Sequence, residues 1–231
     1  TDSLLERVTL WATCAAAGRV GARLVEEGGS IHVGAASVIG VGAYTAALLS
    51  TRAELDPQLA LLATMPMGVT FGGILHAAVS RLSGDVLALA TLAVGVVVHG
   101  VMLNAVDVTG GPMGIAGIPR RPPISGHAAL DAIIFLGALL AILAVSRSKF
   151  VTLRARALRD DENLAQDLGL RPCQVRAMLW VTSSTVLAFV GGLFAFQLRY
   201  IDPSSFTVRE SVRILAMSLV LPYQQGVNAC I

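Results

Sequence analysis

The chain has 231 residues, of which 55% are hydrophobic and only 14% are charged, and its mean hydropathy is +0.72. Soluble domains are typically about 25% charged, so this composition excludes an ordinary soluble protein and indicates one embedded in lipid. The net charge of +2 is small, and the basic residues form no stripe interleaved with aromatic side chains. Nucleic acid is therefore not an expected partner.

Long apolar segments predict membrane-spanning helices. A span needs about 20 mainly apolar residues, because the hydrocarbon core is roughly 30 Å thick. In chain order, spans are expected at 4–25, 33–50, 58–79, 86–106, 128–145 and 177–198. The apolar run at 214–221 is too short to cross a bilayer. The sequence thus predicts an all-α fold, a polytopic transmembrane helical bundle of about six or seven spans that forms one domain over 1–231.

The distribution of charge orients these spans. In the polar loop 146–176, basic residues outnumber acidic ones, which marks the cytoplasmic side of a membrane protein. Counting spans outward from that loop places the connections 51–57, 107–127 and 199–207 outside and the turn 80–85 inside. The chain is therefore expected to cross the membrane several times with the long loop in the cytoplasm.

Several residues inside the expected spans suggest either packing or function. Gly68 and Gly72 form a small-xxx-small pair, which marks close helix packing more often than transport chemistry. His99 and Asn104 lie in the fourth span, where polar side chains form helix–helix hydrogen bonds or contact a substrate. Both interpretations remain open for these two residues.

The segment 108–119 is rich in glycine and proline and cannot form a regular helix. Irregular backbone in a membrane protein must be covered by protein or line a water-filled cavity. We expect this segment at the external mouth or against the bundle, or else as a flexible connector.

Familiar catalytic motifs are missing from the sequence. It contains no G-x-x-x-x-G-K-[ST] loop for phosphates, no G-x-S-x-G elbow and no H-E-x-x-H helix. Cys14, Cys173 and Cys230 are widely spaced and match neither a disulfide framework nor a zinc site. We expect no catalytic residue, no metal and no cofactor.

A short cytoplasmic helix is predicted over 156–170, ending at Gly169. Glycine in a left-handed conformation terminates helices well, and Pro172 just beyond cannot continue one. From charge pattern alone, this helix could be simply a solvated loop element.

The same segment resembles the coupling-helix motif of permeases in the LivM-type branched-chain amino acid ABC transporter family. The motif has the form Arg-Ala-x-Arg-x-x-Glu-x-Ala-x-x-x-Gly, and the matching positions here are Arg156, Ala157, Arg159, Glu162, Ala165 and Gly169. Leu164 and Gln166 depart from the commoner Ala-Ala-Glu run.

Three further segments resemble family motifs in the same order. They are the Gly-x-Gly-Ala-Tyr helix at 40–49, the Thr-Gly-Gly-x-x-Gly-x-x-Gly-Ile-Pro loop at 109–119 and the Ile-x-Pro-x-x-Phe turn at 201–206. The resemblance covers about residues 28–218. It departs at 19–27, at 30–34 and at the ending 221–226, where the family continues with a glycine-rich turn and another helix. The C-terminus is therefore expected to be truncated.

The resemblance implies a transport subunit of the bacterial inner membrane, surrounded by lipid, that is not itself an enzyme. Its implied partners are two ABC ATP-binding subunits, which hydrolyse ATP, a second homologous permease and a periplasmic substrate-binding protein. The implied coupling residues are Arg156, Arg159, Asp160, Glu162, Ala165 and Gly169. The implied substrate is a branched-chain or related amino acid, although near relatives in the family carry urea or amides.

For the substrate pathway, polar or helix-breaking positions near the midplane or the mouth are the candidates. They are Tyr44, His99, Asn104, Gly114 and Gly117. Two rival interpretations remain at this stage. One is an ATP-independent secondary transporter or channel, although no buried carboxylate pair or filter-like motif is visible. The other is an inactive, truncated remnant of the permease.

Overall fold

The computed structural model describes residues 34–82, 84–119, 153–154, 157–158, 161–167 and 169–220. The expected spans at 4–25 and 128–145 lie outside these residues. The membrane-length or near-length helices are α2 (Ala35–Thr51), α3 (Pro57–Val79), α4 (Gly84–Asn104) and α9 (Pro172–Leu198). Shorter elements are α5 (Val106–Thr109), η1 (Gly111–Met113), β1 (Ile115–Ala116), α8 (Glu162–Asp167), β2 (Tyr200–Ile201), η2 (Pro203–Phe206) and α10 (Val208–Val220).

The predicted all-α membrane bundle is confirmed. α3, α4 and α9 are long and apolar enough to cross a membrane, and α2 is a shorter apolar helix. α9 begins at Pro172, five residues before the expected start at 177. Proline is well suited to the first position of a helix, so the polar turn 173–176 extends the span rather than belonging to the loop.

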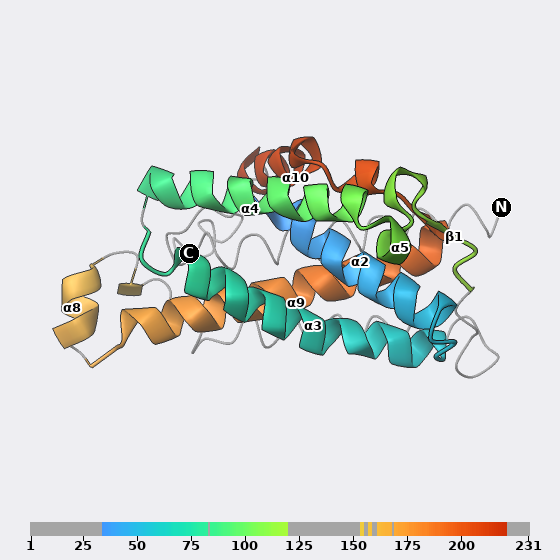
Figure 1. The fold of residues 1–231 in the computed structure, drawn as a ribbon. Helices are drawn as coiled ribbons and strands as arrows, with labels where there is room; N and C mark the ends of the chain where they lie inside the picture. Colours follow the sequence, from blue (N-terminus) through green and yellow to red (C-terminus); the bar gives the residue numbers. More distant parts are fainter. Residues whose placement is uncertain are drawn as a thin grey trace.

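The core of the bundle is the contact of α9 with α2 and α3, in which glycines let backbones approach closely (Figure 1). A Cβ atom on Gly42 would overlap the Ala188 carbonyl oxygen, and one on Gly191 would overlap the Ile39 carbonyl oxygen. Gly68 and Gly72 of α3 face Thr185 and Ser184 of α9 in the same way. The predicted packing role of the Gly68–Gly72 pair is thus confirmed.

The described connections gather at the two ends of the bundle in the groups that the sequence predicts. At one end β1 pairs antiparallel with β2, with Ile115 opposite Ile201, and the α2–α3 turn lies at the same end (Figure 1). At the opposite end α8 lies near the end of α3, and the Cys173 thiol is 3.7 Å from Nε2 of His76. The expected outer connections therefore share one end, and the expected inner ones share the other.

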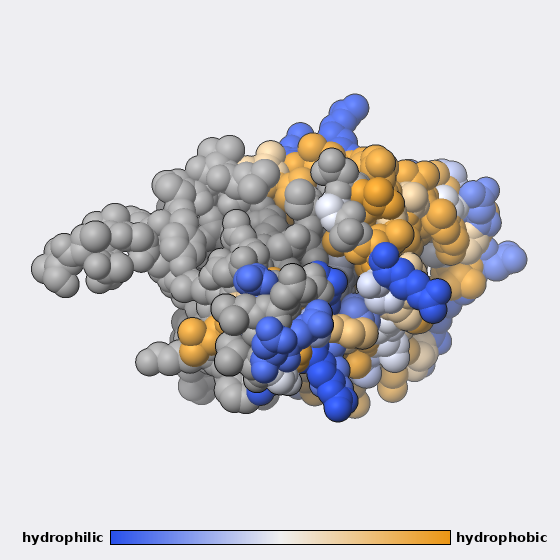
Figure 2. All heavy atoms as spheres, turned by 90° about the vertical axis from the view of Figure 1, so that its left-hand side faces the viewer, coloured by the Kyte–Doolittle hydropathy of each residue, from blue (hydrophilic) through white to orange (hydrophobic). Residues whose placement is uncertain are grey.

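Surface hydropathy agrees with this arrangement. Seen from the α8 end, hydrophilic side chains gather near the centre and apolar side chains gather on an adjoining flank (Figure 2). Along the sides of the bundle, α4 is the least buried of the candidate spans, and Leu89 and Val97 are strongly exposed on it. Such a surface suits lipid or a second membrane protein.

α10 is an amphipathic helix that starts six residues before the expected apolar run at 214. Its 13 residues extend about 20 Å, which is too short to cross the membrane, as the sequence indicates. Ser211 on its buried side accepts a hydrogen bond from the Ala36 backbone N–H at 3.1 Å. This bond caps the first turn of α2, where backbone N–H groups lack partners within the helix.

Replacing Gly191 by alanine is expected to destabilise the bundle, because overpacking a tight core costs about 1–3 kcal/mol. Gly73 is the matched control, since a Cβ atom there would meet nothing within 4 Å and alanine is the better helix former. In detergent, the purified chain should unfold at a lower temperature with Gly191→Ala and at an equal or higher temperature with Gly73→Ala. Equal midpoints for the two variants would contradict the close α2–α9 contact.

Ser211→Ala should lower stability because it removes the α2 cap, an effect of about 0.5–2 kcal/mol. Ser80 provides the comparison, since among the described residues its hydroxyl donates to the Ala77 carbonyl one turn earlier in its own chain segment. Thermal unfolding of the two variants measures the difference. A loss for Ser80→Ala as large as that for Ser211→Ala would show that the hydroxyl of Ser211 does not cap α2.

Candidate functional site

The end of α8 has the predicted glycine cap. Gly169 lies in the left-handed region with φ +83°, its N–H donates to the Gln166 carbonyl at 2.8 Å, and the Leu170 N–H donates to the Ala165 carbonyl at 3.0 Å. These bonds satisfy carbonyl groups at the end of the helix. The chain then turns directly into α9.

A small apolar cluster holds α8 against the base of α9. Ala165 is 1% exposed and packs with Leu158, Val175 and Leu179, of which the last two belong to α9. A larger or charged side chain at position 165 would not fit among them. Because of this cluster, a change in the orientation of α8 would be passed to α9, which runs to the opposite end of the bundle.

The other predicted coupling residues are less fully described. Glu162 begins α8, whereas Arg156, Arg159 and Asp160 lie outside the described residues. The next residue, Asp161, accepts the Ala165 N–H through its backbone carbonyl at 3.0 Å. Of the six predicted positions, Ala165 and Gly169 thus have a defined structural role, and the remainder stay predictions.

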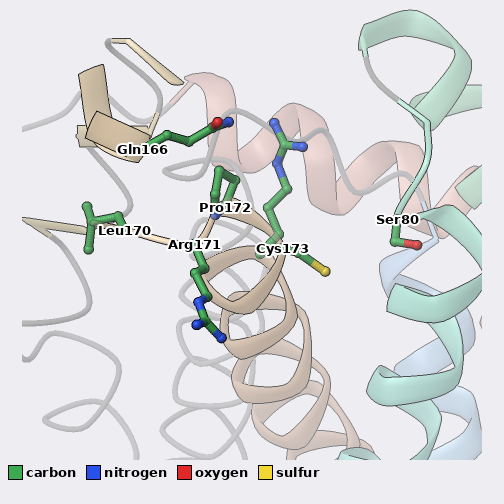
Figure 3. Close-up of a pocket in the computed structure, with 7 residues that line it drawn as sticks. Ser80, Gln166, Leu170, Arg171, Pro172 and Cys173 are labelled. Atoms are coloured by element: carbon green, nitrogen blue, oxygen red, sulfur yellow. The ribbon is translucent and has the colours of Figure 1, made fainter. Parts of the chain in front are cut away.

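A hollow of about 480 Å³ separates α8 from the end of α3 and the start of α9. Figure 3 shows Gln166 of α8 on one side, Ser80 at the end of α3 on another, and the Cys173 thiol pointing toward α3. Two basic side chains, Arg171 and Arg176, also line it. The inner end of the bundle consequently has a recess lined by polar and basic residues beside the candidate coupling helix.

At the outer end, glycines shape the turn that carries η1 and β1. Gly114 has φ +66°, and a Cβ atom there would overlap the Ile201 carbonyl oxygen, so this position requires glycine for both conformation and space. Gly117 also has a positive φ, +76°, but a Cβ atom there would meet nothing within 4 Å. The Tyr200 hydroxyl of β2 donates a hydrogen bond to the Met113 carbonyl of η1 at 3.1 Å and ties these two elements together.

Asp202 organises the adjoining outer turn. Its carboxylate accepts hydrogen bonds from the hydroxyl groups of Ser204 and, at 2.6 Å, Ser205. Partial burial by itself raises the pKa of Asp202, but these hydrogen bonds outweigh burial and hold the pKa below its usual value. The carboxylate therefore keeps its charge, and the turn stays bonded, at neutral pH.

The candidate pathway residues do not converge on one place. Tyr44 is only 4% exposed and packs edge-on against Phe206, with ring centroids 6.2 Å apart. Its hydroxyl has no hydrogen-bond partner among the described residues. Asn104 is exposed and donates to the Gly100 carbonyl of its own helix at 2.7 Å, so its amide already has an internal partner.

His99 has a different setting. With Val96 it forms the α4 wall of a hollow of about 570 Å³, whose other wall is the turn into α10. Of the five pathway candidates, all of which are described, His99 is the one that lines this hollow. The side chains facing it across the hollow are Ser204, Thr207, Val208, Arg209 and Glu210.

The charged residues of α10 were missed from the sequence. Arg209, Glu210 and Arg213 recur at helical spacing among apolar residues, a pattern that predicts an amphipathic helix. A search for apolar runs alone finds only 214–221 and overlooks this pattern. The spacing of these charges could therefore have predicted the helical turn that faces this hollow.

Comparison with known proteins gives the chain its family. A family model described as "Branched-chain amino acid transport system / permease component" matches residues 4–220. The chain is 33% identical over 220 residues to the high-affinity branched-chain amino acid transport system permease protein LivM of Escherichia coli K12, covering 82% of the chain and 51% of that protein. It is 32% identical, with the same coverage, to the LivM protein of Salmonella typhimurium LT2.

The chain spans about half the length of these curated relatives. No solved structure matches it. The family match covers all the described residues, including α8, the outer turn and the helices between them. The chain belongs to the family of permease components of branched-chain amino acid transport systems.

Proposed function

We propose that the chain acts as a permease subunit of an ATP-driven ABC importer in the bacterial inner membrane, moving branched-chain or related amino acids. The names of its relatives, which are high-affinity branched-chain amino acid transport permeases, support this substrate class. The observation that carries the proposal is the seating of α8 on the base of α9, at the end opposite the outer turn. In this proposal, residues 1–231 form one permease domain.

In this proposal an ATP-binding subunit docks at α8, and ATP hydrolysis takes place on that separate chain. Arg156, Arg159, Asp160 and Glu162 would orient the docking through their charges, since charged rims favour orientation and steering over raw affinity. Ala165 and its neighbours on α9 would pass the displacement of α8 into the bundle. α9 suits this task because it is a continuous helix of 27 residues.

The remaining partners would occupy the other faces. A periplasmic substrate-binding protein would deliver the amino acid at the outer end, where β1, β2 and η2 form a bonded turn. A second homologous permease would complete the pathway along the side of the bundle. The least buried span, α4, would move relative to the α2–α3–α9 core during transport, because few contacts bind it to that core.

The function is tested by reconstituting the chain with both ATP-binding subunits, a second permease and the binding protein in proteoliposomes. Uptake of a radiolabelled branched-chain amino acid should require ATP. Uptake that proceeds equally without ATP would favour the secondary-transporter interpretation, and no uptake by a folded, fully assembled complex would contradict the proposal.

Ala165→Asp should uncouple this importer, because a buried carboxylate costs several kcal/mol and the cluster around position 165 is small. We expect α8 to detach from α9 and ATP-driven uptake to fall about tenfold or more, while the chain remains in the membrane. The measurement is initial uptake rate together with ATP hydrolysis by the assembled complex.

Ala53→Asp serves as the matched control, since Ala53 is exposed on the outer α2–α3 turn, far from α8. It should leave uptake close to the wild-type rate. Normal uptake by Ala165→Asp would show that the α8–α9 contact does not transmit the motion.

A further inference from the structure

The exposed side of α10 carries charges that lipid would not tolerate. The Arg213 side chain is 57% exposed and pairs with Glu210 at 3.0 Å. Arg209, the residue directly before Glu210, is also exposed. No ion pair of Arg209 is found among the residues that the structure describes. The exposed side of the first two turns of α10 is therefore cationic overall.

These charges lie level with the middle of α4 and not with either of its ends. Arg209 and Glu210 line the same hollow as Val96, which lies near the middle of the candidate span Val86–Asn104. Ser211, the next residue, caps α2 at Ala36, and Gly95 of α4 comes close to Gly34 at the same level. Figure 1 likewise shows α10 alongside the middle of α4.

A charged side chain facing lipid tails near the bilayer centre costs at least about 2.5 kcal/mol, so such residues face water-filled cavities or protein. The hollow of about 570 Å³ beside Arg209 and Glu210 is of the size that binds small molecules. Its walls combine charges of both signs with the aliphatic side chains of Val96 and Val208.

We propose that this hollow is an amino-acid binding site on the transport pathway, in which Arg209 binds the substrate carboxylate and Glu210 binds its ammonium group. Val96 and Val208 would contact an aliphatic side chain, and His99 would hydrogen-bond the carboxylate from the α4 side. The inference rests on the proposed function and narrows its substrate. The carboxylate of a zwitterion would pair with Arg209, whereas urea or a simple amide offers no negative charge to it; Glu210 would share its carboxylate between Arg213 and the ammonium group.

The central test compares Arg209→Gln with Arg52→Gln in the reconstituted importer. Arg52 is an exposed arginine on the outer turn and provides a matched loss of charge. Loss of a hydrogen bond to a charged group should raise the KM for uptake about tenfold or more for Arg209→Gln, with little change for Arg52→Gln. Arg209→Lys, which keeps the charge, should recover part of the loss and show that the variant folds.

Competition in the wild-type importer tests the substrate class. A second branched-chain amino acid should block uptake of the labelled one, whereas its amide, which lacks the carboxylate, should compete at least about tenfold less well. Equal competition by amino acid and amide, or equal KM values for Arg209→Gln and Arg52→Gln, would overturn the inference while leaving the importer function intact. A wild-type complex that takes up no amino acid would instead overturn the proposed function and this site with it.

Water access provides a readout independent of transport. In a chain with its cysteines replaced by serine, Thr207→Cys, which lines the hollow, should react with a membrane-impermeant thiol reagent, and substrate should slow the reaction. Val97→Cys, on the 64% exposed apolar side chain of α4, should stay unlabelled as a lipid-facing control. Labelling of neither position, or of both equally and without protection by substrate, would contradict an aqueous binding site beside α10.

Discussion

The close contact of helix backbones at Gly42, Gly191, Gly68 and Gly72 is the constraint on which the rest of the structure depends. Lipid tails are as apolar as leucine, so helices in a membrane associate through tight packing more than through exclusion from water. The glycines allow α2 and α3 to lie directly against α9, and α9 becomes the central helix. Because such packed contacts deform little, the three helices form a firm unit around which less tightly held elements can move.

Each end of α9 carries a feature suited to transport. At the inner end, the Ala165 cluster fixes α8 to the first turns of α9, and at the outer end α9 leads directly into β2 and the bonded turn at Asp202. α4 and α10 lie beside this unit with a charged hollow between them. A displacement of α8 would thus reach the outer turn through one continuous helix, and the chain leads from that turn into η2 and α10, which line the hollow.

Much of this fold follows from residue patterns alone, but the site does so only in part. Apolar length predicted α3 and α4, and the left-handed cap at Gly169 followed from a glycine near a proline. The start of α9 was placed too late because polarity at 173–176 resembled a loop. Gly114 could be recognised as part of a turn, but its contact with Ile201 joins distant segments that no local pattern connects. The role proposed for Arg209 depends on its position beside the middle of α4, and that position follows from the packing of α10 against α2 and α4.

The most direct test of the central claim is a pair of spin-label distances in the assembled importer, with and without bound ATP. One pair joins exposed positions 74 and 198 within the α3–α9 unit, and the other joins 198 to the exposed position 101 on α4. The account predicts that ATP leaves the first distance unchanged and shifts the second. A change in the first distance with a constant second would show that the glycine-packed helices are the part that moves and would contradict it.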